Sequence, residues 1–290
     1  MNATIQTPTQ TDQLAVRMLV RAREDFQAMR KRMDNRIGRK ASYRVSIDEE
    51  TGDVIAKGEE QQNIDERVLR PDDMAYFAGI ANAAKYQEAM IEKKLKETLK
   101  RFPVYTEFLS GVKGVGDIAA GWIIGEYDIH KATTVSKLWQ FTGLNPGMVP
   151  GKKRIENKDG TFSYVPSGDL VRGDRLTPGH VAPFNKRLRT AMVGVLADGF
   201  IKAQSPYALE YYYPYKERLA NEQNIPTTAD PEKGKPWKDD SKGHRDRAAK
   251  RYMIKMFLKD LYVAWRTLEG LPVRKSYQEE YLGHAHGEAV

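Results

Sequence analysis

Residues 108–126 have the sequence FLSGVKGVGDIAAGWIIGE, in which three glycines fall within six positions. The pattern predicts one helical turn, a tight loop at residues 114–116 and a second helix that begins near Asp117. Glycines at both ends of the loop permit positive φ and let another backbone or a phosphate come close. We therefore expect the chain to fold around this turn.

The loop ends where the second predicted helix begins, and unpaired amides and the helix dipole favour an anion at that place. The amides of Val115, Gly116 and Asp117 are expected to point outward there, close to Gly114 and Lys113. This spacing of glycine and apolar residues is typical of a helix-hairpin-helix motif, which holds a nucleic-acid phosphate without reading its base sequence. The alternative is a helical turn whose glycines serve packing only.

The composition favours a polyanionic partner. The 290 residues include 47 Lys+Arg against 39 Asp+Glu, a formal net charge of +8, and 40% are hydrophobic, enough for a core. The absence of cysteine excludes disulfides, thiolate metal sites and a Cys nucleophile. No apolar run is long enough to cross a membrane, and the N-terminus lacks a signal-peptide pattern. We expect a cytoplasmic, nucleoid-associated protein with no membrane partner.

Hydrophobic periodicity predicts a mainly α fold: a helix-hairpin-helix core with long flanking helices and one or two small β-hairpins. Helices are expected at 12–37, 71–102, 135–142, 185–204 and 241–268, and hairpins at 42–56 and 154–164. We divide the chain into an N-terminal helix and hairpin (1–70), a helix-hairpin-helix domain (71–220), a linker (221–243) and a C-terminal basic helix and tail packing on the same domain (244–290).

The first helix carries a heptad-like apolar seam that needs a partner. Two partners fit it: the next long helix of the same chain, which is the simpler choice, or a second copy of the chain in a homo-oligomer. The seam residues are Ala15, Leu19, Ala22, Phe26, Met29, Met33 and Ile37, with Arg21, Arg23, Lys31 and Arg32 mostly outside the seam.

The last helix carries Arg247, Arg251, Lys255 and Lys259 at strict four-residue spacing. Like charges at this spacing repel by a few tenths of a kcal/mol per pair. The stripe therefore indicates a phosphate backbone lying against the helix, and the alternative is a solvated helix face.

Two further groups of cations are candidates for nucleic-acid contact. Lys152, Lys153 and Arg154 precede the hairpin predicted within a long loop, and Arg187 and Arg189 follow the start of the helix at 185. Basic ribbons and loops can enter a nucleic-acid groove, and the alternative is a solvated charged loop. A tyrosine cluster at 207–215 can stack on bases or form a half-buried packing face.

Several segments together resemble a known family. The set is similar to the C-terminal transposase domain of the bridge-RNA-guided insertion-sequence transposases, which also carry a DEDD RuvC-like nuclease domain. The resemblance covers roughly residues 70–285 and implies DNA transposition. The matching segments are GVGDIAA (114–120), SKLWQFTGL (136–144), NKRLRT (185–190), KGH (242–244), AAKRYMIKMFL (248–258), WR (265–266) and EGLP (269–272).

The chain departs from that family in two ways. Residues 1–70 leave no room for the nuclease domain, and the acids at 48–53 are typical of a turn. The family's catalytic serine is missing after Gly143-Leu144-Asn145-Pro146, and Ser167 is a speculative substitute. We therefore expect no catalysis by this chain alone and no cofactor, with Mg²⁺ entering only with a nuclease activity or partner. His284 and His286 lack a third metal ligand.

The sequence thus predicts a protein of a mobile element that binds duplex DNA and takes part in transposition or recombination. Three rivals stay open: a module that binds the guide RNA, a recombinase completed by a separate nuclease partner, and a structural protein whose N-terminal seam drives oligomerisation.

Overall fold

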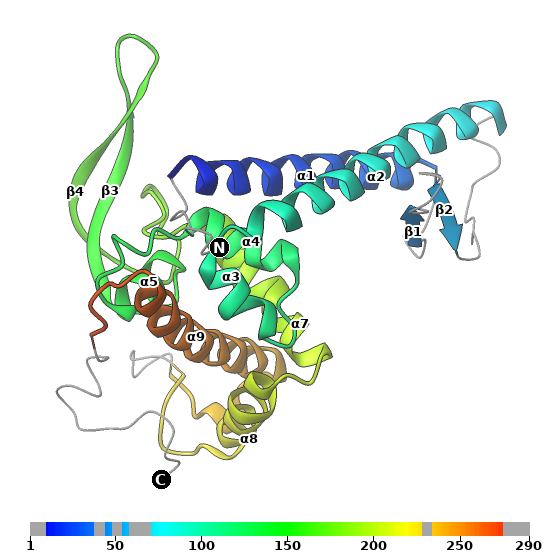
Figure 1. Ribbon diagram of the computed structural model, residues 1–290. Helices are drawn as coiled ribbons and strands as arrows, with labels where there is room; N and C mark the ends of the chain where they lie inside the picture. The colour runs from blue at the N-terminus through cyan, green and yellow to red at the C-terminus, as the bar shows by residue number, and fades with distance from the viewer. Residues whose placement is uncertain (1–9, 38–43, 48–53, 58–70, 228–233, 275–290) are drawn as a thin grey trace. The chain divides into compact units, whose positions relative to one another are not determined.

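The structure, a computed structural model, describes residues 10–37, 44–47, 54–57, 71–227 and 234–274. It is mainly helical with small two-stranded antiparallel hairpins, so the predicted fold class is confirmed (Figure 1). The chain divides into two units, residues 1–102 and residues 103–290. Among the described helices, none combines the length and apolar character that crossing a membrane requires.

The first unit is built on two long helices, α1 (Gln10–Arg36) and α2 (Pro71–Leu99), which pack side by side. They run antiparallel, because Asp12 near the start of α1 meets Arg101 just after the end of α2. The simpler partner for the α1 seam is therefore the one found. Strands β1 (Arg44–Ile47) and β2 (Val54–Lys57) form the predicted first hairpin.

The buried face of α1 is shifted by one residue from the predicted seam. Val16 and Val20 are buried, whereas the predicted Ala15 and Met29 are exposed; at the end of the seam Ile37 is buried as predicted. The shift has a physical cause in α2, whose buried face carries Glu88 in its middle. Turning α1 brings its arginines to this carboxylate, which would otherwise lie buried and unpaired at high cost.

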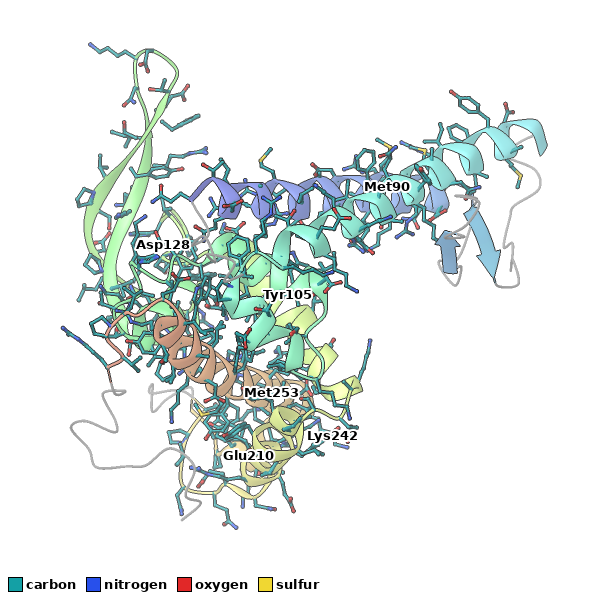
Figure 2. All side chains as sticks on the ribbon, in the orientation of Figure 1. Met90, Tyr105, Asp128, Glu210, Lys242 and Met253 are labelled. Atoms are coloured by element: carbon teal, nitrogen blue, oxygen red, sulfur yellow. The ribbon has the colours of Figure 1, made fainter. Side chains whose placement is uncertain are left out.

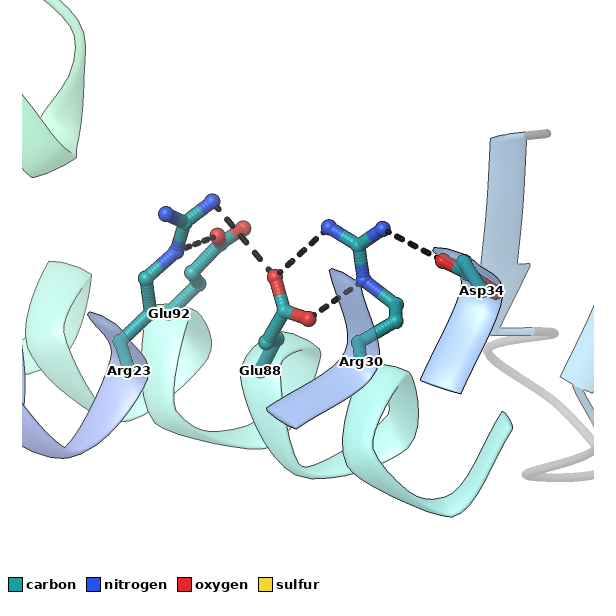
Figure 3. A network of polar contacts seen from close by, with 5 residues as sticks. All are labelled: Arg23, Arg30, Asp34, Glu88 and Glu92. Carbon is teal, nitrogen blue, oxygen red and sulfur yellow. Dashed lines mark hydrogen bonds and ion pairs between the residues drawn. The ribbon is translucent and has the colours of Figure 1, made fainter. Parts of the chain in front are cut away.

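A chain of ion pairs runs along the interface between α1 and α2 (Figure 3). Arg30 Nε lies 2.6 Å from one Glu88 oxygen, and Arg30 Nη1 lies 3.3 Å from Asp34. Arg23 Nε lies 2.8 Å from Glu92 and its Nη2 lies 3.8 Å from Glu88. The hydrogen bond that Arg30 donates to Glu88 is the main reason that the pKa of Arg30 is raised. Arg23, which the sequence placed outside the seam, is thus part of it.

The boundary between the units falls after Phe102, whereas the sequence placed it after residue 70. The reason is that α2 packs along α1 and so belongs to the first unit. Pro103 then starts a new helix, as expected for a residue that cannot continue α2 but suits a first helical turn.

The second unit begins with the predicted helix, loop and helix. α3 (Pro103–Glu107) leads into the 3₁₀ turn η1 (Leu109–Gly111), and α4 (Asp117–Glu126) follows the loop. Gly114 has a φ of +101°, the left-handed conformation that favours glycine. The prediction for residues 108–126 is confirmed at the level of the backbone.

The longest helix of the second unit, α9 (Lys242–Leu268), lies in the middle of its core. Phe257 packs its ring 5.2 Å from that of Phe200 and 5.5 Å from that of Tyr207. Around α9 are α3, α5 (Val135–Phe141), the π-helical turn η2 (Thr190–Leu196), α7 (Ala197–Lys202), the π-helical turn η3 (Ala208–Tyr212) and α8 (Tyr213–Asn221). The short helix α6 (Lys186–Arg189) packs on α4 and η2.

The predicted linker 221–243 is partly ordered against the second unit. The 3₁₀ turn η4 (Trp237–Asp239) lies within it, and the Lys238 N–H donates to the Glu222 carbonyl at 3.0 Å. The Thr227 N–H donates to the Lys235 carbonyl at 2.9 Å. The described parts of the segment, 221–227 and 234–243, therefore pair with each other, and η4 packs on α8.

Strands β3 (Met148–Glu156) and β4 (Phe162–Arg172) form a two-stranded ribbon that extends away from the helices of the second unit (Figure 1). The sequence predicted only its outer part, residues 154–164. Side chains stand out on both faces of the ribbon (Figure 2), and Tyr164 and Leu170 are more than half exposed. The ribbon therefore offers surface that the second unit does not use for its own core.

Candidate nucleic-acid interface

The hairpin loop is filled by the protein at one of its two glycines. A Cβ on Gly114 would lie 2.8 Å from Phe200 Cδ1 and 3.3 Å from the backbone of Gly199. Gly114 therefore permits close packing of the loop on α7. Gly116 has nothing within 4 Å of such a Cβ, and Lys113 is exposed. Of the two loop glycines predicted to contact a phosphate, only Gly116 leaves space for a ligand.

The amides of the loop are also partly engaged. The Val115 N–H donates to the Val112 carbonyl at 3.0 Å, so it is not left for a ligand as the sequence predicted. Asp117 stands in the first turn of α4 and accepts a hydrogen bond of 2.6 Å from the Tyr105 hydroxyl. Burial and then this bond raise the pKa of Tyr105 to about 12. The Asp117 carboxylate itself complements the helix N-terminus and repels a phosphate there.

The second unit contains a cavity of about 840 Å³ lined mainly by basic residues among its charged side chains, here called the basic pocket. It lies between the end of β4, the start of α6, η4 and the first turns of α9. Five of its lining residues are Arg or Lys, and a single one is a carboxylate. The lining is Arg172, Asp174, Arg175, Leu176, Phe184, Lys186, Arg189, Thr190, Thr227, Trp237, His244 and Arg251.

The one carboxylate, Asp174, is already engaged by neighbours. Arg172 donates to its two oxygens at 3.0 and 3.1 Å from Nε and Nη2. Arg189 donates to the Asp174 and Gly143 carbonyls, the latter at 2.7 Å, and its guanidinium lies 4.9 Å from the centre of the Phe184 ring. These contacts hold both arginines in the wall of the pocket and leave little negative charge for the remaining cations.

Arg251 is a half-buried cation of the pocket without a direct ion pair to any described residue. Burial, followed by the nearby charge of Arg189, lowers its pKa, and the charge of Asp174 opposes part of this effect. In the described ranges no carboxylate oxygen lies within 4 Å of its guanidinium. A half-buried cation among like charges is unfavourable without an anion, so Arg251 indicates a place for an anionic ligand.

The predicted basic stripe of α9 is not a uniform exposed row. Arg247 is exposed, Arg251 lines the pocket, and Lys259 is half-buried and engaged with other groups. Lys255 is half-buried with its Nζ 5.3 Å from the centre of the Trp139 ring. Burial, followed by the charge of Arg251, lowers the pKa of Lys255. The stripe therefore runs from solvent past the pocket into the body of the unit.

The basic group of the ribbon is exposed and lies on the strand that pairs with β4. Lys152, Lys153 and Arg154 are all exposed. Lys153 Nζ lies 3.6 Å from Asp169, and the Arg154 guanidinium lies 4.2 Å from the centre of the Phe162 ring. The ribbon ends at Arg172, which lines the basic pocket, so one continuous ribbon carries both the basic group of β3 and part of the pocket lining.

Ser167 lies on β4 but has no base directed at it. Its Oγ accepts the Asp169 N–H at 3.2 Å. The nearby His180 has Nδ1 3.0 Å from the Pro178 carbonyl and Nε2 3.0 Å from the Asp169 carboxylate. Both ring nitrogens thus face acceptors, and the hydrogen bond with His180 lowers the pKa of Asp169. Ser167 therefore makes a local contact within a turn, and this geometry does not support a role for Ser167 as a nucleophile.

The tyrosine cluster mostly serves packing. Tyr207 donates to Asp260 at 2.8 Å, and Tyr212 donates to Asp246. Tyr215 stacks on Tyr252 with ring centres 4.3 Å apart. Bases would have to displace these contacts, so the cluster is not a free stacking surface.

Sequence reasoning found part of the pocket and missed part. Arg189 and Arg251 were predicted and are brought together, whereas Arg187 is half-buried and engaged elsewhere. Arg172, Arg175 and Lys186 were recognisable as cations of the same basic segments but were not among the predicted site residues, and the lining residues Trp237 and His244 were missed. The only signal in the sequence was the density of cations on both sides of the loop at 173–185, with no indication that its ends meet α9.

Comparison with protein-family models, with curated proteins and with solved structures gave no match. Within the part of the chain that the structure describes, no three His, Asp or Glu side chains are grouped to hold a metal ion. The acids at 48–53 and the pair His284 and His286 lie outside the described residues.

Proposed function

We propose that the second unit binds nucleic acid through its sugar–phosphate backbone, with the basic pocket as the main contact surface. The observation that carries the proposal is the charge imbalance: five lining cations surround Asp174, which Arg172 already engages. A concave surface lined by one sign of charge focuses the potential and attracts a polyanion. Contacts of this kind give affinity and salt sensitivity without reading sequence.

The ribbon supports the same proposal as a second contact. A two-stranded β-ribbon has the dimensions to enter the major groove of B-form DNA. Lys152 and Arg154 are exposed on β3, and β4 continues into the wall of the pocket at Arg172. A duplex held at the pocket would therefore be within reach of the ribbon.

The resemblance to the transposase domain favours duplex DNA of a mobile element as the ligand and transposition or recombination as the process. Cytoplasmic, nucleoid-associated location belongs to the same proposal. Guide RNA stays the rival ligand, because its phosphates suit the pocket equally well. The proposal assigns no catalytic step to this chain.

Binding of labelled duplex DNA to the full chain tests the proposal. Wild type is compared with Arg175→Ala/Lys186→Ala/Arg251→Ala, which removes three pocket cations. The matched control Lys31→Ala/Arg32→Ala/Arg36→Ala removes the same charge from exposed positions of α1. Unlabelled structured RNA serves as competitor.

We expect wild type and control to bind with a steep salt dependence. The pocket variant should bind more weakly, and its slope of log affinity against log salt should be shallower by about 0.9 for each phosphate that the variant no longer neutralises. Equal behaviour of both variants would overturn the pocket as the site. If unlabelled structured RNA displaced the labelled duplex at a lower concentration than unlabelled duplex DNA does, RNA would be the preferred ligand.

A further inference from the structure

The basic pocket is lined by aromatic rings as well as by cations. These rings belong to Phe184, which lies beside the Arg189 guanidinium, and to Trp237. A plain backbone-binding surface has no need of aromatic rings. Aromatic side chains beside cations are instead the combination that proteins use to stack exposed bases while holding the strand's phosphates.

Contacts within the second unit position both aromatic residues, Phe184 and Trp237. Phe184 packs on Gly143, where an added Cβ would lie only 2.7 Å from Phe184 Cγ. The ring of Trp237 lies 5.0 Å from that of His244, and the Trp237 carbonyl accepts from Arg245 Nη1 at 3.2 Å. A preorganised aromatic ring binds a flat partner at little further ordering cost.

The shape of the pocket separates two ligands. Its volume of about 840 Å³ falls within the range of about 300–1,000 Å³ typical of sites that enclose small molecules. Duplex DNA presents only the edge of its backbone to such a concavity, because its bases are stacked inside the helix. An unstacked nucleotide can place its phosphate near the lining cations and, at the same time, its base against a lining aromatic ring.

We infer that the basic pocket accepts an unstacked nucleotide of a DNA strand, with its phosphate near Arg251 and Lys186 and its base against Trp237. The inference rests on the proposed function and deepens it, because it names the part of the nucleic acid that enters the pocket. An unpaired strand end and an unpaired internal nucleotide share this chemistry.

Affinity measurements on matched duplexes test the inference. The full chain is titrated against a blunt duplex, the same duplex with a short single-stranded overhang, and one with a single-nucleotide bulge, each at two salt concentrations. Trp237→Ala removes the stacking surface, and Trp237→Phe keeps an aromatic ring. Tyr76→Ala, which removes an exposed aromatic ring from α2 in the first unit, is the control.

Stacking on an aromatic side chain is worth about fivefold to about a hundredfold in affinity per base. We expect wild type, Trp237→Phe and Tyr76→Ala to prefer an unpaired substrate over the blunt duplex by such a factor. A preference for the overhang would indicate an unpaired strand end, and a preference for the bulge would indicate an unpaired internal nucleotide. Trp237→Ala should bind all three substrates as wild type binds the blunt duplex. Equal binding of the three substrates by wild type would overturn the inference and leave the proposed function standing, whereas no salt-sensitive binding of any duplex would remove both.

Discussion

The two units treat buried positive charge in opposite ways. In the first unit, Arg23 and Arg30 enter the interface between α1 and α2, and each meets a carboxylate at less than 3 Å. In the second unit, Arg251 and Lys255 are half-buried with their pKa values lowered, and like charges contribute to the lowering. The protein neutralises the first set with its own carboxylates, whereas no ion pair among the described residues neutralises the second set.

The difference teaches how to separate structural from functional cations. Burying a charge is unfavourable, and a fold normally offsets this with a counter-ion of its own. Where a cavity holds several cations and a single carboxylate that is already paired, we infer that an anionic ligand supplies the remaining counter-charge. The raised pKa of Arg30 and the lowered pKa of Arg251 express the same contrast.

The largest loss of unfolding free energy is expected from Glu88→Ala. This change removes a carboxylate partner from the arginines of the first unit, so that their charge is less compensated, as in the second unit. It leaves Arg30 and Arg23 near the α1–α2 interface with one partner fewer each, and removing one partner of a buried ion pair costs about 3–5 kcal/mol. Urea unfolding followed by circular dichroism measures the change. The control Glu97→Ala breaks an exposed pair with Lys94 and should cost less than about 1 kcal/mol. Similar losses for both variants would refute a special role of the seam.

A smaller loss of unfolding free energy is expected from a change in the hairpin loop, and it distinguishes a glycine needed for packing from one that faces open space. Gly114→Ala puts a Cβ 2.8 Å from Phe200 at a φ of +101°, and should cost about 1–3 kcal/mol of unfolding free energy. Gly116→Ala meets open space at a φ of −96° and should be tolerated. Thermal unfolding of both variants checks this. If Gly116→Ala were the more destabilised of the two, the packing account of this loop would be wrong.

A small pH effect is expected beside the pocket. The pKa of Lys255 is lowered, so the unfolded state holds that proton more tightly, and stability rises as the pH passes through the lowered value. Over the same window Lys255 loses its charge, and affinity for duplex DNA falls. Titrating binding and stability from neutral pH to about pH 10 should show both trends in wild type and neither in Lys255→Met. Identical profiles in the two proteins would contradict this assignment.

The sequence predicted the parts of the fold that depend on local signals. Pro103, the glycines of residues 108–126 and the apolar spacing of α9 each fixed an element that the structure contains. The face of α1 was missed because one polar residue on α2, Glu88, outweighs the apolar pattern of α1. A pattern within one helix cannot report a partner on another.

The candidate site shows the same limit. Arg189 and Arg251 were found from their spacing, but the pocket arises because the loop after β4 and the turn at Trp237 meet the start of α9. The occupied amide of Val115 was equally invisible, because its acceptor is set by the turn geometry. Contacts between distant segments decided which predicted residues became a site.

The most direct test of the account is the stability of Arg251→Met with and without a short DNA oligonucleotide. The account predicts that without DNA the variant is at least as stable as wild type, because an uncompensated half-buried charge is replaced by an apolar side chain of similar length. It also predicts that DNA stabilises wild type more than the variant. A variant that is less stable without DNA, and that DNA stabilises as much as wild type, would show that Arg251 is a structural cation like Arg30 and contradict the account.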